Sequence, residues 1–191
     1  GGTSRADPEA YADRNGYGTH VAGTIGAAGN NGRGVTGVNW SVGLISLRTL
    51  GPDGSGPVSG IVDALNFLTK RLEEDASLKV AAVNLSLNWF SPMVPTLANQ
   101  RKDPVWRAFK ALDSLNRTVI VTSAGNDGLE VGVLAPADGP KGADGTPTYE
   151  RGDYVYSSSY RGIHNLIVVG ASSQNGSLAN FSNWSRDFVD V

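Results

Sequence analysis

Four short segments of the chain are almost continuously hydrophobic, and each has the length of a strand. They are residues 42–50, 80–87, 118–124 and 165–171, which are rich in β-branched and aliphatic side chains. Runs of this kind are typical of strands in a parallel sheet that is buried on both faces. The pattern therefore predicts a mostly parallel sheet built from these four segments.

Two segments between these strands have the spacing of amphipathic helices. In residues 57–75 the apolar stripe consists of Ile61, Leu65, Leu68 and Leu72. In residues 103–116, Asp103 is predicted to be the N-cap and Pro104 suits the first helical turn. The apolar face of this second helix consists of Val105, Phe109 and Leu112. Both helices are expected to cover the sheet.

Strands that alternate with helices predict an α/β fold, here a three-layer sandwich with a mostly parallel sheet. Residues 129–159 are rich in Gly, Pro and Asp and have no sustained period, so we expect them to form a long surface excursion. The sequence has no internal repeat and no domain-sized linker. A length of 191 residues then favours a single domain.

Composition excludes several functional classes. The 16 basic residues nearly balance the 18 acidic residues, so the net charge is −2 and binding to nucleic acid is not expected. The chain has no cysteine and therefore no disulfide or thiolate metal site. No apolar run approaches the roughly 20 residues that cross a bilayer, and the first residues lack the charged and apolar regions of a signal peptide. We expect no membrane span.

Three motifs follow one another along the chain: YGTHVAGTIGA at residues 17–27, NLSLN at residues 84–88 and VTSAGNDG at residues 121–128. Two weaker matches, GPDGSGPVSGIVDAL at residues 51–65 and VVGASSQNGSLANFSNWS at residues 168–185, lie in the same order. Together these motifs resemble the subtilisin-like serine peptidases over most of the chain. The resemblance implies a central fragment of the subtilisin-like catalytic domain, incomplete at both ends. It also implies endopeptidase hydrolysis through an acyl-enzyme, performed by a serine, a histidine and an aspartate.

Tyr17 stands where the resemblance places the catalytic histidine. A phenol with a reference pKa near 10 cannot shuttle a proton at neutral pH as imidazole does. In subtilisin itself, from which this magnitude comes, loss of the histidine costs on the order of 10⁶ in turnover. His20 lies about 4.5 Å further along the helix axis and matches a structural position of the family. We therefore expect no peptidase activity from this chain.

The aspartate and serine segments of the family are also expected to lie outside these residues. Neither Asp7 nor Asp13 has the strand and turn that carry the aspartate, and Asp13 fits the polar run before the histidine position. An alternative is a pseudopeptidase that serves as a peptide-binding or structural module. An unrelated nucleotide-binding domain is less consistent, because GNNGRG follows a helix and lacks the GxGxxG spacing.

The resemblance implies a peptide-binding site around an oxyanion donor. Asn126, in a tight turn after a buried strand, is the predicted donor. An extended peptide or protein substrate is expected between residues 54–56 and 86–88. The predicted substrate-binding residues are Gly54, Ser55, Gly56, Ser86, Leu87, Asn88, Ala124, Gly125 and Asp127. Asn88 replaces a glycine of the family and is expected to narrow the specificity pocket, while Asp127 at its rim would favour a basic side chain. A solvated turn aspartate is the alternative for Asp127.

The loop at residues 29–38 resembles one that holds a structural calcium ion in many family members. The side chain of Asn31 and the carbonyls of Gly29, Arg33 and Val35 are the candidate ligands. The alternative is an empty Gly-Asn helix C-cap, which Arg33 favours by its positive charge. The chemistry itself requires no cofactor. The resemblance further implies a secreted or cell-envelope protein, and the family's own prodomain as a partner.

Overall fold

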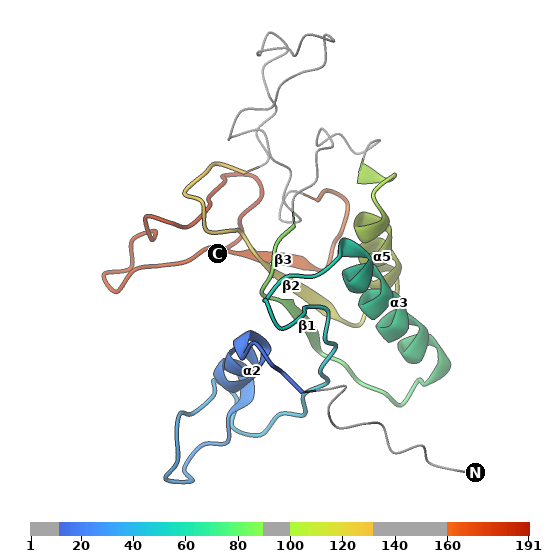
Figure 1. The fold of residues 1–191 in the computed structure, drawn as a ribbon. Coiled ribbons are helices and arrows are strands. Elements are labelled where there is room, and N and C mark those ends of the chain that lie inside the picture. Colours follow the sequence, from blue (N-terminus) through green and yellow to red (C-terminus); the bar gives the residue numbers. More distant parts are fainter. Residues whose placement is uncertain (1–11, 90–99, 132–159) are drawn as a thin grey trace, which may run out of the picture. The chain divides into compact units, whose positions relative to one another are not determined.

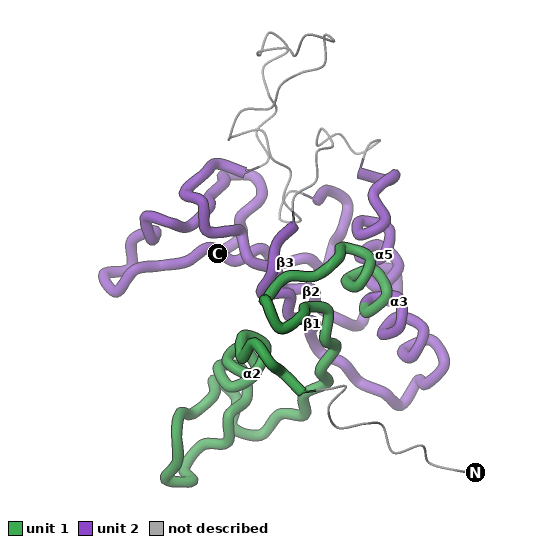
Figure 2. Tube along the Cα trace, viewed as in Figure 1, with its two compact units in different colours: residues 1–64 green, residues 65–191 purple. Residues whose placement is uncertain are grey.

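The computed structural model describes residues 12–89, 100–131 and 160–191. The chain divides into two compact units, residues 1–64 and residues 65–191, which Figure 2 distinguishes by colour. The boundary falls within a continuous helix, α3 (Val58–Glu74). The predicted single domain therefore stays a prediction. Of the expected surface excursion at residues 129–159, all but the first three residues lie outside the described chain.

The first unit contains helix α2 (Tyr17–Gly26), which the GTHVAG motif predicted. The helix ends at Ala27, whose backbone turns to an extended conformation and whose N–H donates to the carbonyl of Gly23. After a glycine-rich loop the chain returns along the helix end, where Gly37 donates to the carbonyl of Ala27 at 2.9 Å and Val38 to that of Thr24 at 3.0 Å. The loop at residues 29–36 is thus closed at its base.

The predicted strand at residues 42–50 is wrong, because the structure has no strand there. Leu44 and Ile45 are 50% and 57% exposed, so this apolar run is not buried as predicted. A strand exists only where a neighbouring strand completes its ladder of hydrogen bonds. Among the described residues of the first unit no other segment is a strand, so the run has no partner strand within that unit.

The second unit is built on a parallel sheet of three strands, β1 (Ala82–Leu85), β2 (Val119–Ser123) and β3 (Leu166–Val169). Their spatial order is β1-β2-β3 (Figure 1). Register places Asn84 opposite Val121 and Val121 opposite Ile167. All three strands confirm their predicted segments, although each is shorter than predicted. Because they are parallel, their carboxyl ends meet at one edge of the sheet.

Helix α5 (Pro104–Ser114) packs against β2 and confirms the prediction for this segment. Asp103 is its N-cap, with the side chain accepting from the N–H of Val105 at 2.8 Å. Phe109 of this helix and Ile120 of β2 are both fully buried. The guanidinium of Arg117, just after α5, donates to the carbonyl of Leu72 near the end of α3.

The sheet is not buried equally on its two faces, contrary to the prediction. Ile120 and Thr122 of β2 are buried, whereas Val119 of the same strand is 37% exposed. Ile167 and Val169 of β3 are exposed to a similar degree. Among the described residues of the second unit, α5 and the second half of α3 cover one face only (Figure 1). The helical layer and the sheet are two of the layers that the predicted α/β sandwich requires.

Candidate functional site

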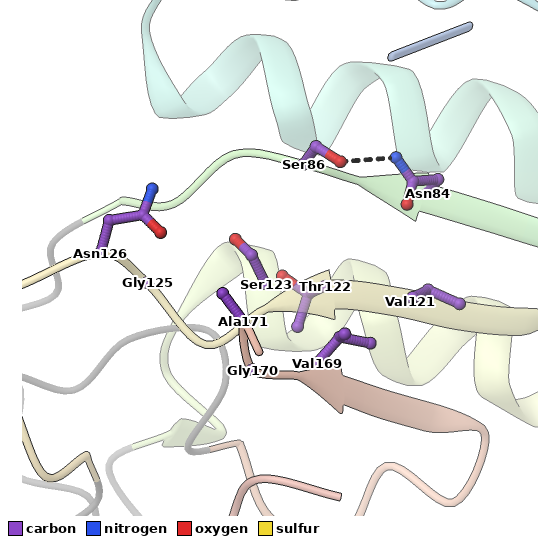
Figure 3. A pocket seen from close by; sticks show the side chains of 10 residues that line it. All are labelled: Asn84, Ser86, Val121, Thr122, Ser123, Gly125, Asn126, Val169, Gly170 and Ala171. Atoms are coloured by element: carbon purple, nitrogen blue, oxygen red, sulfur yellow. Dashed lines mark hydrogen bonds between the residues drawn. The ribbon is translucent and has the colours of Figure 1, made fainter. Parts of the chain in front are cut away.

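A pocket of about 330 Å³ lies where the three parallel strands end (Figure 3). Strand β1 and the residue after it, β2 with its following turn, and the end of β3 form its walls. The lining residues are Asn84, Ser86, Val121, Thr122, Ser123, Gly125, Asn126, Val169, Gly170 and Ala171. The carboxyl edge of a parallel sheet is where α/β folds bind their ligands. This pocket is therefore the candidate site of the second unit.

Asn126 lines the pocket and is exposed to solvent. It lies in the turn after β2, directly behind Gly125, whose φ of 107° is a conformation that residues with side chains rarely adopt. Figure 3 shows the carboxamide of Asn126 turned toward the pocket. An amide N–H in this place can donate to a carbonyl oxygen that gains negative charge. The structure thus brings the predicted oxyanion donor to the predicted edge of the sheet.

A side chain distant in sequence is bonded to the turn that carries Asn126. Asn183 has no exposed surface, and its Oδ1 accepts from the N–H of Asp127 at 2.9 Å and from that of Leu129 at 3.0 Å. Its Nδ2 donates to the carbonyl of Ala124 at 3.0 Å. Sequence reasoning did not single out Asn183, although residues 168–185 belong to a matched segment. Only knowledge that this asparagine is buried could have identified it, and no local pattern gives that.

Ser86 and Asn88, which are predicted to bind substrate, lie on the segment that leaves β1. The hydroxyl of Ser86 accepts from Nδ2 of Asn84 at 2.8 Å. The side-chain amide of Asn88 lies 3.0 Å from Oγ of Ser123, so it reaches from the end of β1 to the end of β2. Leu87 between them is half-buried. Ser86 lines the pocket and Asn88 does not, so a narrowing of the pocket by Asn88 stays a prediction.

The other predicted substrate-binding residues of this unit lie in the turn itself. Ala124 and Gly125 are buried, so they can contribute backbone but little side-chain surface. Asp127 is exposed, and its carboxylate lies 3.4 Å from Nδ2 of Asn183. The carboxylate therefore directly follows Asn126 in the same turn and is accessible to solvent.

Gly54, Ser55 and Gly56, the other predicted substrate-binding residues, belong to the first unit and form a tight turn. The carboxylate of Asp53 accepts from the hydroxyl of Ser55 at 2.6 Å and from its N–H at 3.1 Å. The carbonyl of Ser55 in turn accepts from Gly51 at 2.7 Å. This residue's backbone is thus used inside a tight turn, with Gly54 at φ 78°. A role of this segment in peptide binding stays a prediction.

Tyr17 is the first residue of α2 and is 48% exposed. The N-cap, Gly16, has no side chain, and the carboxylate of Asp13 takes over its role. One oxygen of Asp13 accepts from the N–H of Gly16 at 2.8 Å, while the other accepts from the N–H of Thr19 at 2.8 Å and from its hydroxyl at 2.7 Å. Asp13 therefore fixes the helix start that presents Tyr17, and is not an aspartate that orients a base.

These donors change the acidity of Asp13. The hydroxyl of Thr19, followed by the backbone N–H groups of Gly16 and Thr19, holds the pKa of the Asp13 carboxyl well below its ordinary value of 3.8.

His20, the other candidate base, is exposed within the helix, and its backbone N–H donates to the carbonyl of Gly16 at 2.9 Å. Asp7 lies outside the described residues.

The candidate calcium loop does not have a donor set that fits the ion in this conformation. The side-chain oxygen of Asn31 accepts from the N–H of Arg33 at 3.0 Å, which is the bond of a local turn. The loop contains no carboxylate, and Arg33 adds a positive charge. Gly29 packs against the ring of Trp40, while Val35 is 71% exposed. Calcium binding stays a prediction from the resemblance, and the function proposed below does not depend on it.

The described residues contain neither a metal-ligand cluster nor a helix that could span a membrane. No three His, Asp or Glu side chains in this part of the chain gather as metal ligands. No helix among residues 12–89, 100–131 and 160–191 has both the length and the hydrophobicity that a bilayer requires.

Comparison with known proteins gives one consistent result. Subtilisin-like protease 4 of Trichophyton tonsurans is 28% identical over 190 residues, which cover 100% of this chain to the nearest per cent and 37% of that protein. Among solved structures, Sphericase is 26% identical with a TM-score of 0.59 and covers 90% of this chain and 46% of its own. A cold-adapted subtilisin-like serine proteinase at 23% identity shares the fold with a TM-score of 0.57, over 91% of this chain and 46% of its own.

The chain thus spans little more than a third of the length of its curated relative. It has the α/β fold of subtilisin-like proteins. The family model described as the subtilase family matches residues 2–191. This match covers nearly every residue, including the helix start at Tyr17 and the turn at Asn126, and the chain therefore belongs to the subtilase family.

Proposed function

We propose that this chain binds an extended peptide at the carboxyl edge of its sheet and polarises a peptide carbonyl with Asn126, without hydrolysing the bond. The observation that carries the proposal is the exposed carboxamide of Asn126 at the pocket, on a turn held from both sides. Peptidases of the family use such a donor for the oxygen of the tetrahedral intermediate. The same donor also binds the carbonyl of an intact peptide.

Hydrolysis is absent in this proposal because of the residue at position 17. The mechanism needs a group that takes the serine proton and returns it to the leaving amine near neutral pH. A tyrosine hydroxyl donates a hydrogen bond under these conditions but does not accept the proton. The polarised carbonyl is then held without being attacked.

The peptidase reaction itself is the second candidate, and family membership favours it. Both candidates use the same pocket, because in each of them Asn126 would donate to a carbonyl oxygen of the peptide. They differ in one property that can be measured directly, the turnover of a peptide with Tyr17 in place.

The pocket suggests which peptides bind. Asp127 is exposed beside the oxyanion turn, and an acid there favours a basic or polar side chain in the ligand. The amide of Asn88 is bonded to Ser123, a residue of the pocket wall, and would narrow the pocket there. Slender basic side chains fit both features. The protein's own prodomain would bind at the same pocket. A secreted or cell-envelope location of the protein agrees with the family.

The proposal is tested on the full-length protein and its Tyr17→His and Tyr17→Phe variants. Binding of a fluorescent peptide with a central lysine is measured by anisotropy, turnover with a chromogenic peptide, and labelling with a serine-directed phosphonate. We expect the unaltered protein to bind the peptide without turnover or labelling, and Asn126→Ala to weaken binding. Tyr17→His should gain turnover, which Asn126→Ala should then lower on the order of 10²- to 10³-fold.

Two outcomes contradict the proposal. Turnover and labelling by the unaltered protein would show that it is an active peptidase. Loss of that turnover in Tyr17→Phe would then show that the Tyr17 hydroxyl takes part in catalysis. Failure to bind any peptide, in a protein that is folded by circular dichroism, would remove the peptide-binding function.

A further inference from the structure

Asn183 is the best-connected buried side chain near the pocket. Both heteroatoms of its amide are used: three partners are backbone groups of the turn at residues 124–129, and the carboxylate of Asp127 lies 3.4 Å from Nδ2. Asn183 has no exposed surface. A buried amide with three backbone bonds to one short segment is costly to replace, because each lost bond leaves a backbone group of the turn without that partner.

The positions of these partners explain what the side chain does. The carbonyl of Ala124 lies before Asn126 in the chain, and the N–H groups of Asp127 and Leu129 lie after it. Asn183 therefore clamps the backbone on both sides of the oxyanion donor. A side chain at position 125 would clash with Nδ2 of Asn183, which shows how closely the amide packs against Gly125.

Backbone contacts between the two segments do not depend on this side chain. The N–H of Asn183 donates to the carbonyl of Gly125 at 2.9 Å, Trp184 donates to Leu129 at 2.9 Å, and Gly128 donates to Phe181 at 2.8 Å. These bonds keep the segments paired when the amide of Asn183 is removed. The loss should therefore loosen the turn around Asn126 without unfolding the sheet.

We propose that Asn183 is the positioning residue for the oxyanion donor: its side-chain amide holds the turn at residues 124–129 so that the carboxamide of Asn126 faces the pocket. This inference rests on the proposed function for the role of Asn126. A displacement of about 1 Å in such a group can cost on the order of 10²-fold in rate. Asn183 does not touch the peptide and acts only through Asn126.

The first test needs no catalysis and uses the unaltered protein and its Asn183→Ala variant. Backbone order parameters and amide exchange are measured by NMR. In Asn183→Ala we expect the order parameter of Asn126 to fall from about 0.85 to below about 0.6. The amides of Asp127 and Leu129 should lose protection, while that of Val168 in β3 keeps it. Asn180→Ala, which alters an exposed asparagine of the same segment, is the matched control and should change none of these values.

The second test measures the consequence for the reaction, in the full-length Tyr17→His background. We expect Asn183→Ala to lower kcat about 10- to 100-fold with little change in KM, because the donor acts on the transition state. In the double variant with Asn126→Ala, the loss of Asn183 should cost almost nothing further. A residue that merely stabilises the fold would instead give additive losses.

The results separate the two proposals. An unchanged order parameter at Asn126 in Asn183→Ala overturns the positioning role whether or not any variant is active. Additive losses of kcat overturn it as well. Absence of turnover in Tyr17→His counts against the proposed reason for inactivity, and the NMR result still decides whether Asn183 holds the turn.

Discussion

Asp13 shows how a single side chain can start a helix from outside the usual position. An N-cap is normally Ser, Thr, Asp or Asn, but position 16 is a glycine in the left-handed conformation. That conformation turns the chain back so that the carboxylate of Asp13 reaches the N–H groups of Gly16 and Thr19. The helix was predicted from its motif, whereas its capping residue was not, because the cap depends on the backbone angles of Gly16.

Replacing Thr19 tests the capping arrangement. The hydroxyl of Thr19 makes the largest contribution to the lowered pKa of Asp13, and Thr19→Val removes it with little change of shape. We expect the pKa of Asp13, measured by NMR titration of its carboxyl carbon, to rise toward 3.8 in this variant. It should stay somewhat below that value, because the backbone donors remain. Thr24→Val, whose hydroxyl bonds to His20, is the control and should leave the titration unchanged.

The sign of this shift fixes the pH at which Asp13 matters. Its folded pKa is lower than its unfolded pKa, so the ionised carboxylate stabilises α2 at every pH above about 3.9. That contribution is lost as the pH falls through the folded pKa. A titration of Asp13 at or above its ordinary value would show that the carboxylate does not cap the helix.

At the scale of elements, a buried carboxylate joins α5 to the start of β3. Asp113 accepts from the N–H of Asn165 at 2.8 Å and from that of His164 at 2.9 Å. Its other oxygen accepts from the ammonium of Lys110 at 2.6 Å. Burial raises the pKa of Asp113, but the Lys110 ammonium and these backbone donors outweigh it, so the pKa lies below 3.8. His164 is thus bonded to Asp113 at this junction and does not line the pocket.

Removal of this carboxylate should destabilise the second unit. Asp113→Ala leaves two backbone N–H groups without an acceptor, which we expect to cost about 2–3 kcal/mol in the free energy of unfolding. Urea unfolding at pH 7, followed by NMR signals of β2 and β3, measures this loss. Because the folded pKa is lowered, the difference from the unaltered protein should persist above pH 4 and shrink below it.

An exposed ion pair provides the control for Asp113. Glu74 lies 3.7 Å from Lys70 with half of its side chain exposed, and Glu74→Ala should cost less than about 1 kcal/mol. Equal losses for the two variants would mean that the bonds of Asp113 do not stabilise the junction between α5 and β3.

The strands show what local patterns can and cannot predict. Residues 80–87, 118–124 and 165–171 contain strands because each has a neighbour to pair with. Residues 42–50 have a similar hydrophobic pattern but no strand. The hydrophobic pattern reports that a segment tends to be buried, while a strand also needs a partner at the right place. That partner is not encoded in the segment itself.

At the scale of the whole molecule, the core of the second unit joins segments that are far apart in the sequence. Phe109 of α5 contacts Trp89 after β1 and Tyr160 before β3, with ring centroids 6.0 Å and 5.6 Å apart. The hydroxyl of Tyr160 donates to the carboxylate of Asp103, the N-cap of α5. Burial and this carboxylate raise the pKa of Tyr160, so it remains neutral. These three rings thus form one aromatic cluster, which links α5 to the residues after β1 and before β3.

Phe109→Ala tests this core. The ring is fully buried, and its removal should cost about 3–5 kcal/mol in the unfolding of the second unit. Phe67→Ala removes a ring that is 55% exposed on α3 and should cost far less. Urea unfolding detected by amide signals of β2 compares the two variants. Similar losses would show that the aromatic cluster is not the core of this unit.

The sequence predicted only the part of the candidate site that lies in short motifs. Asn126 and residues 86–88 were predicted from short motifs at the ends of strands, and the parallel sheet brings them to one edge. The turn conformation of residues 54–56 depends on Asp53, and the clamp on Asn126 depends on Asn183. These contacts arise from the folded chain, so motif spacing alone could not predict them.

The clamp also limits how the protein can be modified. Asn183 begins the triplet Asn-Trp-Ser, which is an acceptor for N-linked sugars in proteins secreted by eukaryotic cells. The sugar would be attached to Nδ2, the atom that donates to Ala124 in the closed turn. A glycan cannot be accommodated on a side chain with no exposed surface, whereas the asparagines of the other triplets, at positions 39, 84, 116, 175 and 180, are exposed. A eukaryotic host must therefore leave Asn183 unglycosylated for the turn at residues 124–129 to close as it does in this structure.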